Sequence, residues 1–337
     1  MTTSPEAVVI RRTDPPRPPR SGWQVVAAKE FGDGILSVRL FILIALLGLA
    51  AVGAIYSTAS FVGNNAQSIT GAPGLFVLLF SNPDPNSQVP SFAQLVGLLG
   101  PLLGIAFGFD AINGERSERT LPRLIAQPIH RDAVIIGKFV AGLGVIGVVL
   151  GAITLIVSGV AFVILGVNPS PDDIARLAAW FVVALAYLGF WLAFAMLCSV
   201  VVRRAATSAL AAIALWIVLT IFAQLLVGIV ADYMSPVPAS PTIEQQVANA
   251  ELSDELARIS PGTLYSEASA YLLNPQLQTV DIGAQVAQQS NSGAIPSVLP
   301  LGQSLLLAWP QVVALLALTS VCFGLGYISF MRQEVRA

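Results

Sequence analysis

The sequence predicts an all-α membrane protein with six transmembrane helices, and three observations support this prediction. Of the 337 residues, 55% are hydrophobic and only 11% are charged, whereas a soluble domain has about 25% charged residues. Several apolar stretches reach about 20 residues, the length at which a helix crosses a bilayer. The basic residues are confined to alternate segments between these stretches.

Six apolar stretches define the predicted spans. They lie near residues 38–60, 91–109, 139–166, 176–201, 206–231 and 304–330. Fifteen of the 17 Lys and Arg residues lie on one side of these spans, in segments 1–39, 110–138, 202–205 and 331–337. Because Lys and Arg gather in cytoplasmic loops, we expect both termini to be cytoplasmic. Arg outnumbers Lys by 15 to 2, which is typical of a GC-rich bacterial genome, and so the expected location is a bacterial plasma membrane.

The N-terminal region divides into a tail and a helix. Residues 1–20 are polar and Pro-rich, which predicts a disordered cytoplasmic tail and is unlike a secretory signal peptide. Over residues 21–37, apolar side chains recur near helical spacing, with Lys29 and Glu30 among the charges between them. This pattern predicts an amphipathic elbow helix in the inner interface, with Trp23 at headgroup depth. The alternative is a simple cytoplasmic extension of the first span.

A long polar segment, 232–303, separates span five from span six. Residues 38–231 hold the first five spans, and 304–337 hold the sixth span and a cytoplasmic tail. An amphipathic run over Ile243–Ile259 predicts that 232–303 is a small, helical, extracytoplasmic insertion. The insertion has seven acidic residues and one basic residue, Arg258. Solubility and topology explain this balance, and a surface that attracts cations is the alternative.

The sequence offers few groups for catalysis. The core of each predicted span lacks Asp, Glu, Lys, Arg and His, whereas ion-coupled transporters keep ionisable groups near the midplane. His130 is the only histidine, and neither an HExxH motif nor a phosphate-binding loop occurs. Cys198 and Cys322 lie in separate apolar runs, so we expect buried thiols rather than a disulfide or a zinc site. We therefore expect no catalytic residue, metal or cofactor on this chain, and a net charge of −2 gives no support for nucleic-acid binding.

Small residues recur where helices must approach closely. The second and third spans carry glycines at spacings of three or four residues, at Gly100, Gly104, Gly108, Gly144, Gly147 and Gly151. Small faces let membrane helices pack at short range. We expect these faces to pack within the chain, and a dimer interface is the alternative.

The segment 110–138 is a charged hairpin between two apolar stretches and holds five of the 17 basic residues. Thr120 is placed to cap a short helix over Leu121–Gln127, with Pro122 tolerated in its first turn and Pro128 at its end. Leu121 and Leu124 then share a small apolar face. Such a helix suits a groove on a cytoplasmic protein, and the alternative is a solvated loop that only fixes topology.

The same hairpin resembles the central motif of ABC type-2 exporter permeases. The motif residues here are NGERSERTL over Asn113–Leu121, IAQPI over 125–129, then Arg131 and GKF at 137–139. KEF at 29–31 is similar to the elbow of that family. ISP at 259–261, with LYSEA at 264–268, looks like the outer segment of the branch that includes the permease for nitrous-oxide-reductase maturation. With the six-span layout, the resemblance extends over nearly the whole chain.

The resemblance implies that Glu115–Gln127 forms a coupling helix, with Lys138 near the inner headgroups. The residues expected to couple to an ATPase are Glu115, Arg116, Glu118, Arg119, Thr120, Leu121, Leu124, Gln127, Pro128 and Arg131. Two positions depart from the family pattern, because Arg119 stands where Gly is usual and Pro122 where Glu is frequent. Both departures bear on where the helix begins and on its contacts.

The resemblance also implies partners and a mechanism. Two copies of a cytoplasmic ABC ATPase, carrying ATP and magnesium, would move the coupling helices of two permease chains, most simply a homodimer, and so drive export. An alternative within the family is a permease that transmits motion to an extracytoplasmic partner without passing a substrate. An alternative from another class is an ATP-independent membrane channel or scaffold. The spans are generic Leu, Val, Ala and Gly surfaces and leave the substrate open.

Overall fold

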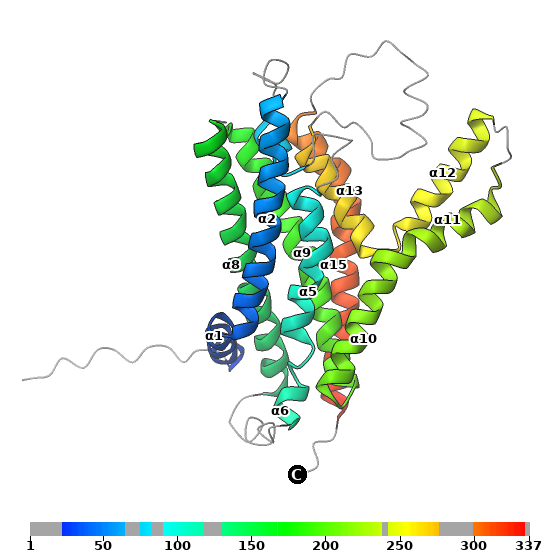
Figure 1. Cartoon of the computed structure of the whole chain (residues 1–337). Coiled ribbons are helices and arrows are strands. Elements are labelled where there is room, and N and C mark those ends of the chain that lie inside the picture. Colours follow the sequence, from blue (N-terminus) through cyan, green and yellow to red (C-terminus); the bar gives the residue numbers. More distant parts are fainter. Residues whose placement is uncertain are drawn as a thin grey trace, which may run out of the picture.

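The computed structural model describes residues 22–64, 75–81, 90–117, 130–166, 168–237, 242–275 and 299–333. All regular structure in these ranges is helical. Six helices are long and apolar enough to cross a membrane: Val38–Tyr56, Phe92–Ser117, Arg131–Val163, Pro171–Val201, Ala205–Phe222 and Leu301–Arg332. The prediction of an all-α chain with six spans is confirmed. The long helices run side by side as an upright bundle, from which one helical hairpin projects (Figure 1).

Helix α1 (Gly22–Ile35) lies across the foot of α2 (Val38–Asn64) and appears end-on in Figure 1. It packs along the lower part of α8 (Arg131–Leu165). The approach is close: a Cβ added at Gly137 would lie 2.8 Å from Cβ of Val26, and one added at Gly144 would lie 3.3 Å from the Phe31 ring. A helix therefore exists where the sequence predicts the elbow, and it rests on the third span.

Helices α5 (Phe92–Gly108) and α9 (Pro171–Val201) form the centre of the bundle. Both begin with a capping box, in which the side chain of Ser91 or Ser170 accepts a hydrogen bond from the backbone N–H three residues on. Glycines on α5 face α9 within the same chain. A Cβ at Gly104 would lie 2.8 Å from the carbonyl oxygen of Leu188, and one at Gly108 would lie 2.6 Å from Cβ of Ala195. The two backbones are thus almost in contact.

Helix α8 begins at Arg131, whereas the sequence places the start of the third span near 139. The extra turns carry Lys138 inside the helix. Further along, Gly147 and Gly151 face Leu185 and Phe181 of α9, where an added Cβ would sit at an ordinary 3.6 Å from the nearest atom. The third span is therefore less tightly packed at these glycines than α5 is at Gly104.

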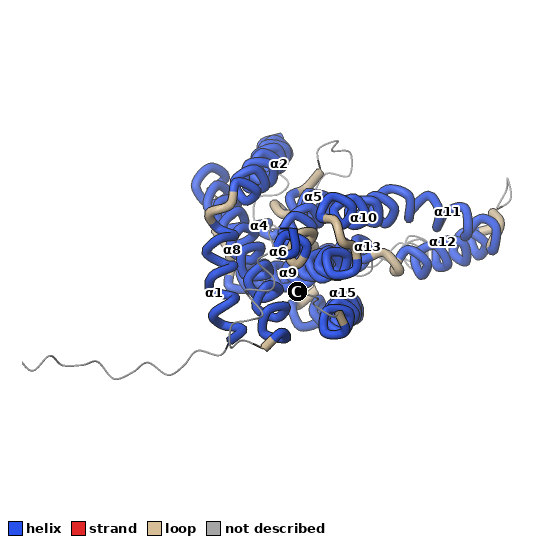
Figure 2. The backbone as a smooth tube through the Cα atoms, turned by 90° about the horizontal axis from the view of Figure 1, so that it is seen from below, coloured by secondary structure: helices blue, strands red, loops and turns tan. Residues whose placement is uncertain are grey.

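The fifth span is divided. Helix α10 (Ala205–Ile217) passes into a π-helical turn, η1 (Val218–Phe222), and then into α11 (Ala223–Met234). Sequence periodicity predicts a single span over 206–231 and gives no sign of the π turn. Such turns are rare and often lie at functional sites. From this turn, α11 and the returning α12 (Ile243–Ala257) project sideways as a hairpin, in both Figure 1 and the view from below in Figure 2.

Helix α13 (Pro261–Leu273) returns to the bundle and packs against α9 and α15 (Leu301–Arg332). The predicted insertion is therefore helical in its described part, and half of it is built into the body. At the N-terminal end of α9, Arg176 is 1% exposed and donates to Asp172 at 2.6 Å, to Ser304 Oγ at 3.0 Å and to two backbone carbonyls, those of Leu272 and Leu299. This guanidinium fastens the end of α13 to α9 and α15.

Helix α13 also brings a carboxylate of an ion pair into the bundle, close to α15. Glu267 is 9% exposed, accepts from Arg258 Nε at 3.1 Å, and accepts from Gln311 Nε2 of α15 at 2.8 Å. Inspection of the predicted spans alone misses this carboxylate because the insertion supplies it. A short helix, α4 (Leu75–Leu78), covers the same end, where Phe80 packs on Trp180 with ring centroids 6.2 Å apart.

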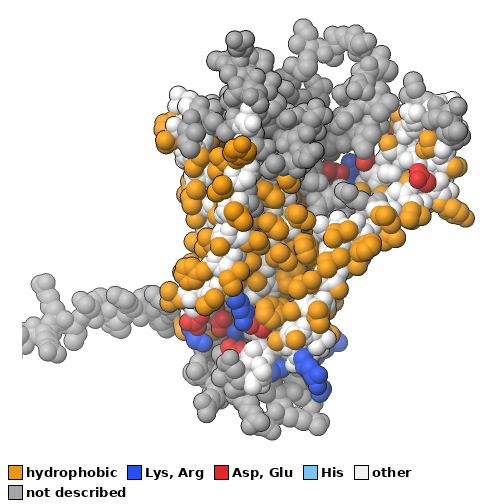
Figure 3. All heavy atoms as spheres, in the orientation of Figure 1, with side chains coloured by type: hydrophobic (Ala, Val, Ile, Leu, Met, Phe, Trp, Pro, Cys, Tyr) orange, Lys and Arg blue, Asp and Glu red, His pale blue; other side chains and the backbone are white. Residues whose placement is uncertain are grey.

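On the face shown in Figure 3, hydrophobic and charged side chains cover different parts of the molecule. Hydrophobic side chains cover the bundle and the underside of the projecting hairpin, while Lys, Arg, Asp and Glu gather at the lower end (Figure 3). The apolar belt is what lipid requires of a spanning surface. The lower cluster of charge contains the residues of the candidate site.

Candidate functional site

The hairpin after α5 is described at its two ends. Near its start, Asn113–Ser117 form a short helix, α6. The described residues continue at His130, the residue before α8. Glu115, Arg116 and Arg131 belong to these ends. The other residues expected to couple to an ATPase, together with the predicted helix over 121–127, lie outside the described residues: Glu118, Arg119, Thr120, Leu121, Leu124, Gln127 and Pro128.

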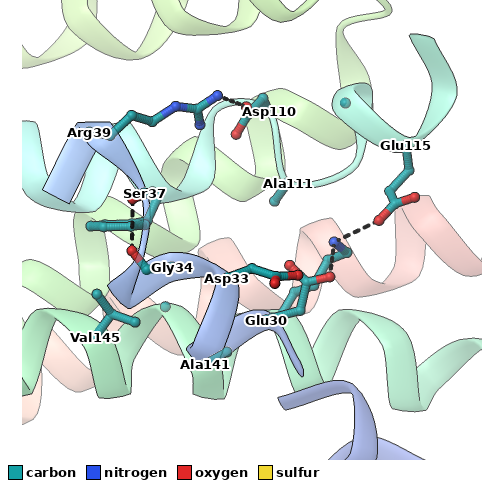
Figure 4. A pocket seen from close by; sticks show the side chains of 14 residues that line it. Glu30, Asp33, Gly34, Ser37, Arg39, Asp110, Ala111, Glu115, Ala141 and Val145 are labelled. Atoms are coloured by element: carbon teal, nitrogen blue, oxygen red, sulfur yellow. Dashed lines mark hydrogen bonds and ion pairs between the residues drawn. The ribbon is translucent and has the colours of Figure 1, made fainter. Parts of the chain in front are cut away.

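Lys138 stands between α1 and α6. Its ammonium donates to Glu30 Oε1 of α1 at 2.8 Å and to Glu115 Oε1 of α6 at 3.2 Å. Figure 4 shows Glu30 and Glu115 reaching this nitrogen from different helices. The Lys138 side chain is 6% exposed. The sequence places Lys138 near the inner headgroups, and the structure adds that α8 begins earlier than predicted and that α1 covers the face of α8 on which this side chain lies.

Another ion pair, between Arg39 and Asp110, lies across the same end of the bundle from Lys138. Arg39, at the start of α2, donates to Asp110 at 2.6 Å, and its guanidinium lies 5.2 Å from the centre of the Phe109 ring. The Arg39 side chain is half exposed, so solvent screens this pair. Between the two pairs is a cavity of about 320 Å³, whose polar lining includes Glu30, Arg39, Asp110, Glu115 and Lys138 (Figure 4).

The start of the hairpin is seated on the end of α9. Ser199 Oγ accepts from the backbone N–H of Ile112 at 3.0 Å and from that of Asn113 at 3.1 Å. These are donors that α6 cannot use within its own first turn. Asn113 is itself 1% exposed, and among the residues that the structure describes neither polar atom of its side chain has a hydrogen-bond partner. The backbone N–H groups at the start of α6 are therefore satisfied by Ser199, whereas the Asn113 side chain has no partner among the described residues.

Gln333, directly after α15, joins the two ends of the hairpin. Its side-chain oxygen accepts from Arg116, and its backbone oxygen accepts from Arg131 Nη1 at 3.3 Å. Its amide nitrogen donates to the carbonyl of Val200 at 2.9 Å. The end of the sixth span is therefore bonded to both ends of the hairpin and to α9. Sequence reasoning missed Gln333 and Ser199, because neither carries charge and neither belongs to a motif.

The two cysteines are free, and each is partly exposed rather than buried as expected. Within the residues that the structure describes, no group of three or more His, Cys, Asp or Glu side chains is arranged to hold a metal ion. What the site holds is a set of ion pairs and hydrogen bonds that join α1, α6, α8, α9 and α15 at one end of the bundle. Such a set can transmit displacement between helices.

Comparison of the sequence with known proteins finds curated relatives. Two curated relatives are each described as a probable ABC transporter permease protein NosY. The protein from Stutzerimonas stutzeri is 28% identical over 199 residues, which is 58% of this chain and 64% of the relative. The protein from Pseudomonas aeruginosa is 29% identical over 156 residues, 46% of this chain and 50% of the relative. The chain thus matches between half and two thirds of the length of these relatives.

The family comparison extends over more of the sequence. The profile of the ABC-2 family transporter proteins matches residues 24–335, from α1 to the end of the sixth span. The match includes the charged hairpin and both ion pairs that line the cavity. This chain is a multi-pass membrane permease and belongs to the ABC-2 family of transporter proteins.

Proposed function

We propose that this permease exports a substrate with energy from ATP that a separate cytoplasmic ATPase hydrolyses, and that hairpin 110–138 receives the ATPase. The observation that carries the proposal is the seating of α6. Ser199, Lys138 and Gln333 bond it to α9, α8 and the end of α15. A force applied to the hairpin would therefore reach three spans directly. The sequence adds dense charge on the hairpin, which suits recognition of a soluble partner.

The proposed assembly follows the symmetry of ABC transporters. Two ATPase subunits with ATP and magnesium act on two permease chains, most simply two copies of this one, in a bacterial plasma membrane. Both termini and hairpin 110–138 face the cytoplasm, and α12 faces the other side. The positive-inside distribution of Lys and Arg supports this orientation. The proposed contacts to the ATPase lie between Arg116 and Gln127, followed by Pro128 and Arg131, whereas Glu115 is bonded to Lys138 within the chain.

Assembly is tested by producing the full chain together with ABC ATPase subunits of the same organism and purifying the complex. Glu118→Lys with Arg119→Glu reverses two charges of the hairpin, and Glu255→Lys, on the exposed surface of α12, is the matched control. We expect the hairpin variant to bind the ATPase at least tenfold more weakly, about 1.4 kcal/mol, and the control to bind normally. Equal binding by all three chains would refute docking at this hairpin.

Orientation is tested in intact cells with a thiol reagent that does not cross membranes. In a chain whose two cysteines are replaced by Ala, Ser117→Cys should react only after permeabilisation, and Glu255→Cys should react at once. Both positions are exposed in the structure. The reverse pattern would invert the proposed topology.

The second candidate function is transmission of motion to an extracytoplasmic partner without passage of a substrate. The observation that favours it is the fastening of α13, whose Glu267 bonds to Gln311 of α15 and whose end is held by Arg176. ATP-dependent motion of α15 or α9 would thus move α13. Ser266→Cys, exposed on α13, should change its labelling rate with ATP under this function, even where vesicles accumulate no substrate. A rate that is independent of ATP would remove this candidate.

A further inference from the structure

The geometry points to Lys138 as the positioning residue that couples the hairpin to α1. This inference rests on the proposed function, because it assigns the route by which hairpin motion would reach the first helix. The buried ammonium of Lys138 is bonded to two carboxylates, and these come from two different elements, α1 and α6. An ammonium has three N–H donors, so it can hold both carboxylates at once.

The contact of Lys138 with Glu30 and Glu115 depends on the positive charge of the lysine. Two carboxylates share one ammonium, and their side chains are only 24% and 15% exposed. Removal of the positive charge would take from Glu30 and Glu115 the donor that they share in a poorly solvated corner, where the loss of a charged partner costs more than in water. The lysine thus determines how far α1 stands from α6. Glu115, predicted as a contact to the ATPase, is here turned inward and bonded within the chain.

Helices α1 and α6 pack on different parts of the bundle, so α6 can move relative to α1 and the contact through Lys138 can transmit that movement. Helix α1 rests on α8, where an added Cβ at Gly34 would lie 3.0 Å from Val145 Cγ2 and one at Gly137 would lie 2.8 Å from Val26. Helix α6 is seated instead on the ends of α9 and α15 by Ser199 and Gln333. Lys138 lies where these two supports meet. When α6 is displaced relative to α8, the pair with Glu115 pulls on the lysine, and the pair with Glu30 carries the pull to α1.

The cavity leaves room for this displacement. The space of about 320 Å³ lies directly beside Glu30, Glu115 and Lys138, in contrast to the close contact of α5 with α9. Across the cavity, Arg39 and Asp110 tie the start of α2 to the end of α5. That pair is half exposed and is worth little in water. The buried pairs of Lys138 therefore dominate the coupling.

The experiment measures the distance between α1 and α6 by spin labelling in a chain whose native cysteines are replaced by Ala. Labels are placed at Ala28→Cys on α1 and Ser117→Cys on α6, both exposed positions. The control pair is Ala28→Cys with Val140→Cys, which is 41% exposed on α8. Lys138→Met should lengthen and broaden the distances between 28 and 117 and leave those between 28 and 140 unchanged. Lys138→Arg, which keeps the charge, should preserve both.

The functional arm uses the complex of the full chain with its ATPase. Glu115→Gln keeps the pair of Lys138 with Glu30 and so preserves the fold if Lys138→Met does not. We expect ATPase binding to persist in Glu115→Gln. The ratio of the two distance populations between 28 and 117, with ATP relative to without it, should fall by roughly 2- to 30-fold, the range for residues that carry coupling. An unchanged distance response in both variants would overturn the role of Lys138. Failure of the unmodified chain to bind the ATPase would instead refute the proposed function, and the distances in the isolated chain would still decide whether Lys138 holds α1 to α6.

Discussion

Tyr187 of α9 and Tyr265 of α13 stack with their ring centroids 4.7 Å apart. Each hydroxyl donates to a backbone carbonyl of α5, Tyr187 to Gly97 at 2.8 Å and Tyr265 to Ala93 at 2.9 Å. Burial raises the pKa of Tyr265 far above its usual value, so the phenol stays protonated and remains a donor. The stacked pair thus locks the insertion to the centre of the bundle.

Replacing either phenol by Phe should therefore cost one hydrogen bond without loss of stacking. We expect Tyr265→Phe and Tyr187→Phe each to lower the free energy of unfolding by about 1 kcal/mol. Tyr233→Phe is the control, because Tyr233 is 88% exposed and should have no effect. Thermal unfolding of the purified chain in detergent measures all three. Equal stability of the Tyr265→Phe chain and the unmodified chain would show that the bond to Ala93 contributes nothing.

The crossing of α5 and α9 depends on glycine. At Gly104, an added Cβ would lie 2.8 Å from the backbone oxygen of Leu188 and 2.8 Å from the backbone nitrogen of Leu192. Backbone atoms cannot turn aside as a side chain can, so we expect Gly104→Ala to cost about 1–3 kcal/mol of unfolding free energy, as overpacking does. Gly48→Ala on α2, where no atom lies within 4 Å of an added Cβ, should be neutral. Similar melting temperatures for the two variants would contradict the close crossing.

Arg176 should be needed to hold α13 in place. Arg176→Met removes the guanidinium and leaves the carbonyls of Leu272 and Leu299 without that donor. Because hydrogen bonds from a charged group contribute about 1.5–3 kcal/mol each, we expect faster amide hydrogen exchange over 261–275 and a lower melting temperature. Arg39→Met is the control, since that side chain is half exposed and its loss should leave exchange in α13 unchanged. Unaltered exchange in Arg176→Met would mean that the other contacts of α13, among them the tyrosine pair and the bond of Glu267 to Gln311, hold it without the guanidinium.

The sequence predicts the helices better than it predicts the contacts between them. The spans can be predicted from the length of the apolar stretches, and the charged hairpin from its density of Arg and Glu, because both are local properties of the sequence. The burial of Lys138 could not be predicted in this way, since it depends on α1 folding back onto α8. The burial of Glu267 could not be predicted for a related reason: this residue lies outside every span in the sequence and reaches Gln311 only when α13 packs on α15. The π turn at Val218–Phe222 has no residue signature, because its apolar residues fit an α-helix equally well.

The unsatisfied amide of Asn113 leads to the last prediction. A buried polar group without a partner costs about 1–3 kcal/mol, so Asn113→Leu, whose side chain has the same branched shape and the same number of heavy atoms, should leave the melting temperature unchanged or raise it. Ser199→Ala is the comparison, because it deprives the backbone N–H groups of Ile112 and Asn113 of their acceptor and should lower the melting temperature. Both variants are measured in one detergent by thermal unfolding. If Asn113→Leu proves as destabilising as Ser199→Ala, the amide has a partner in the folded protein, and the seat of α6 is fully satisfied.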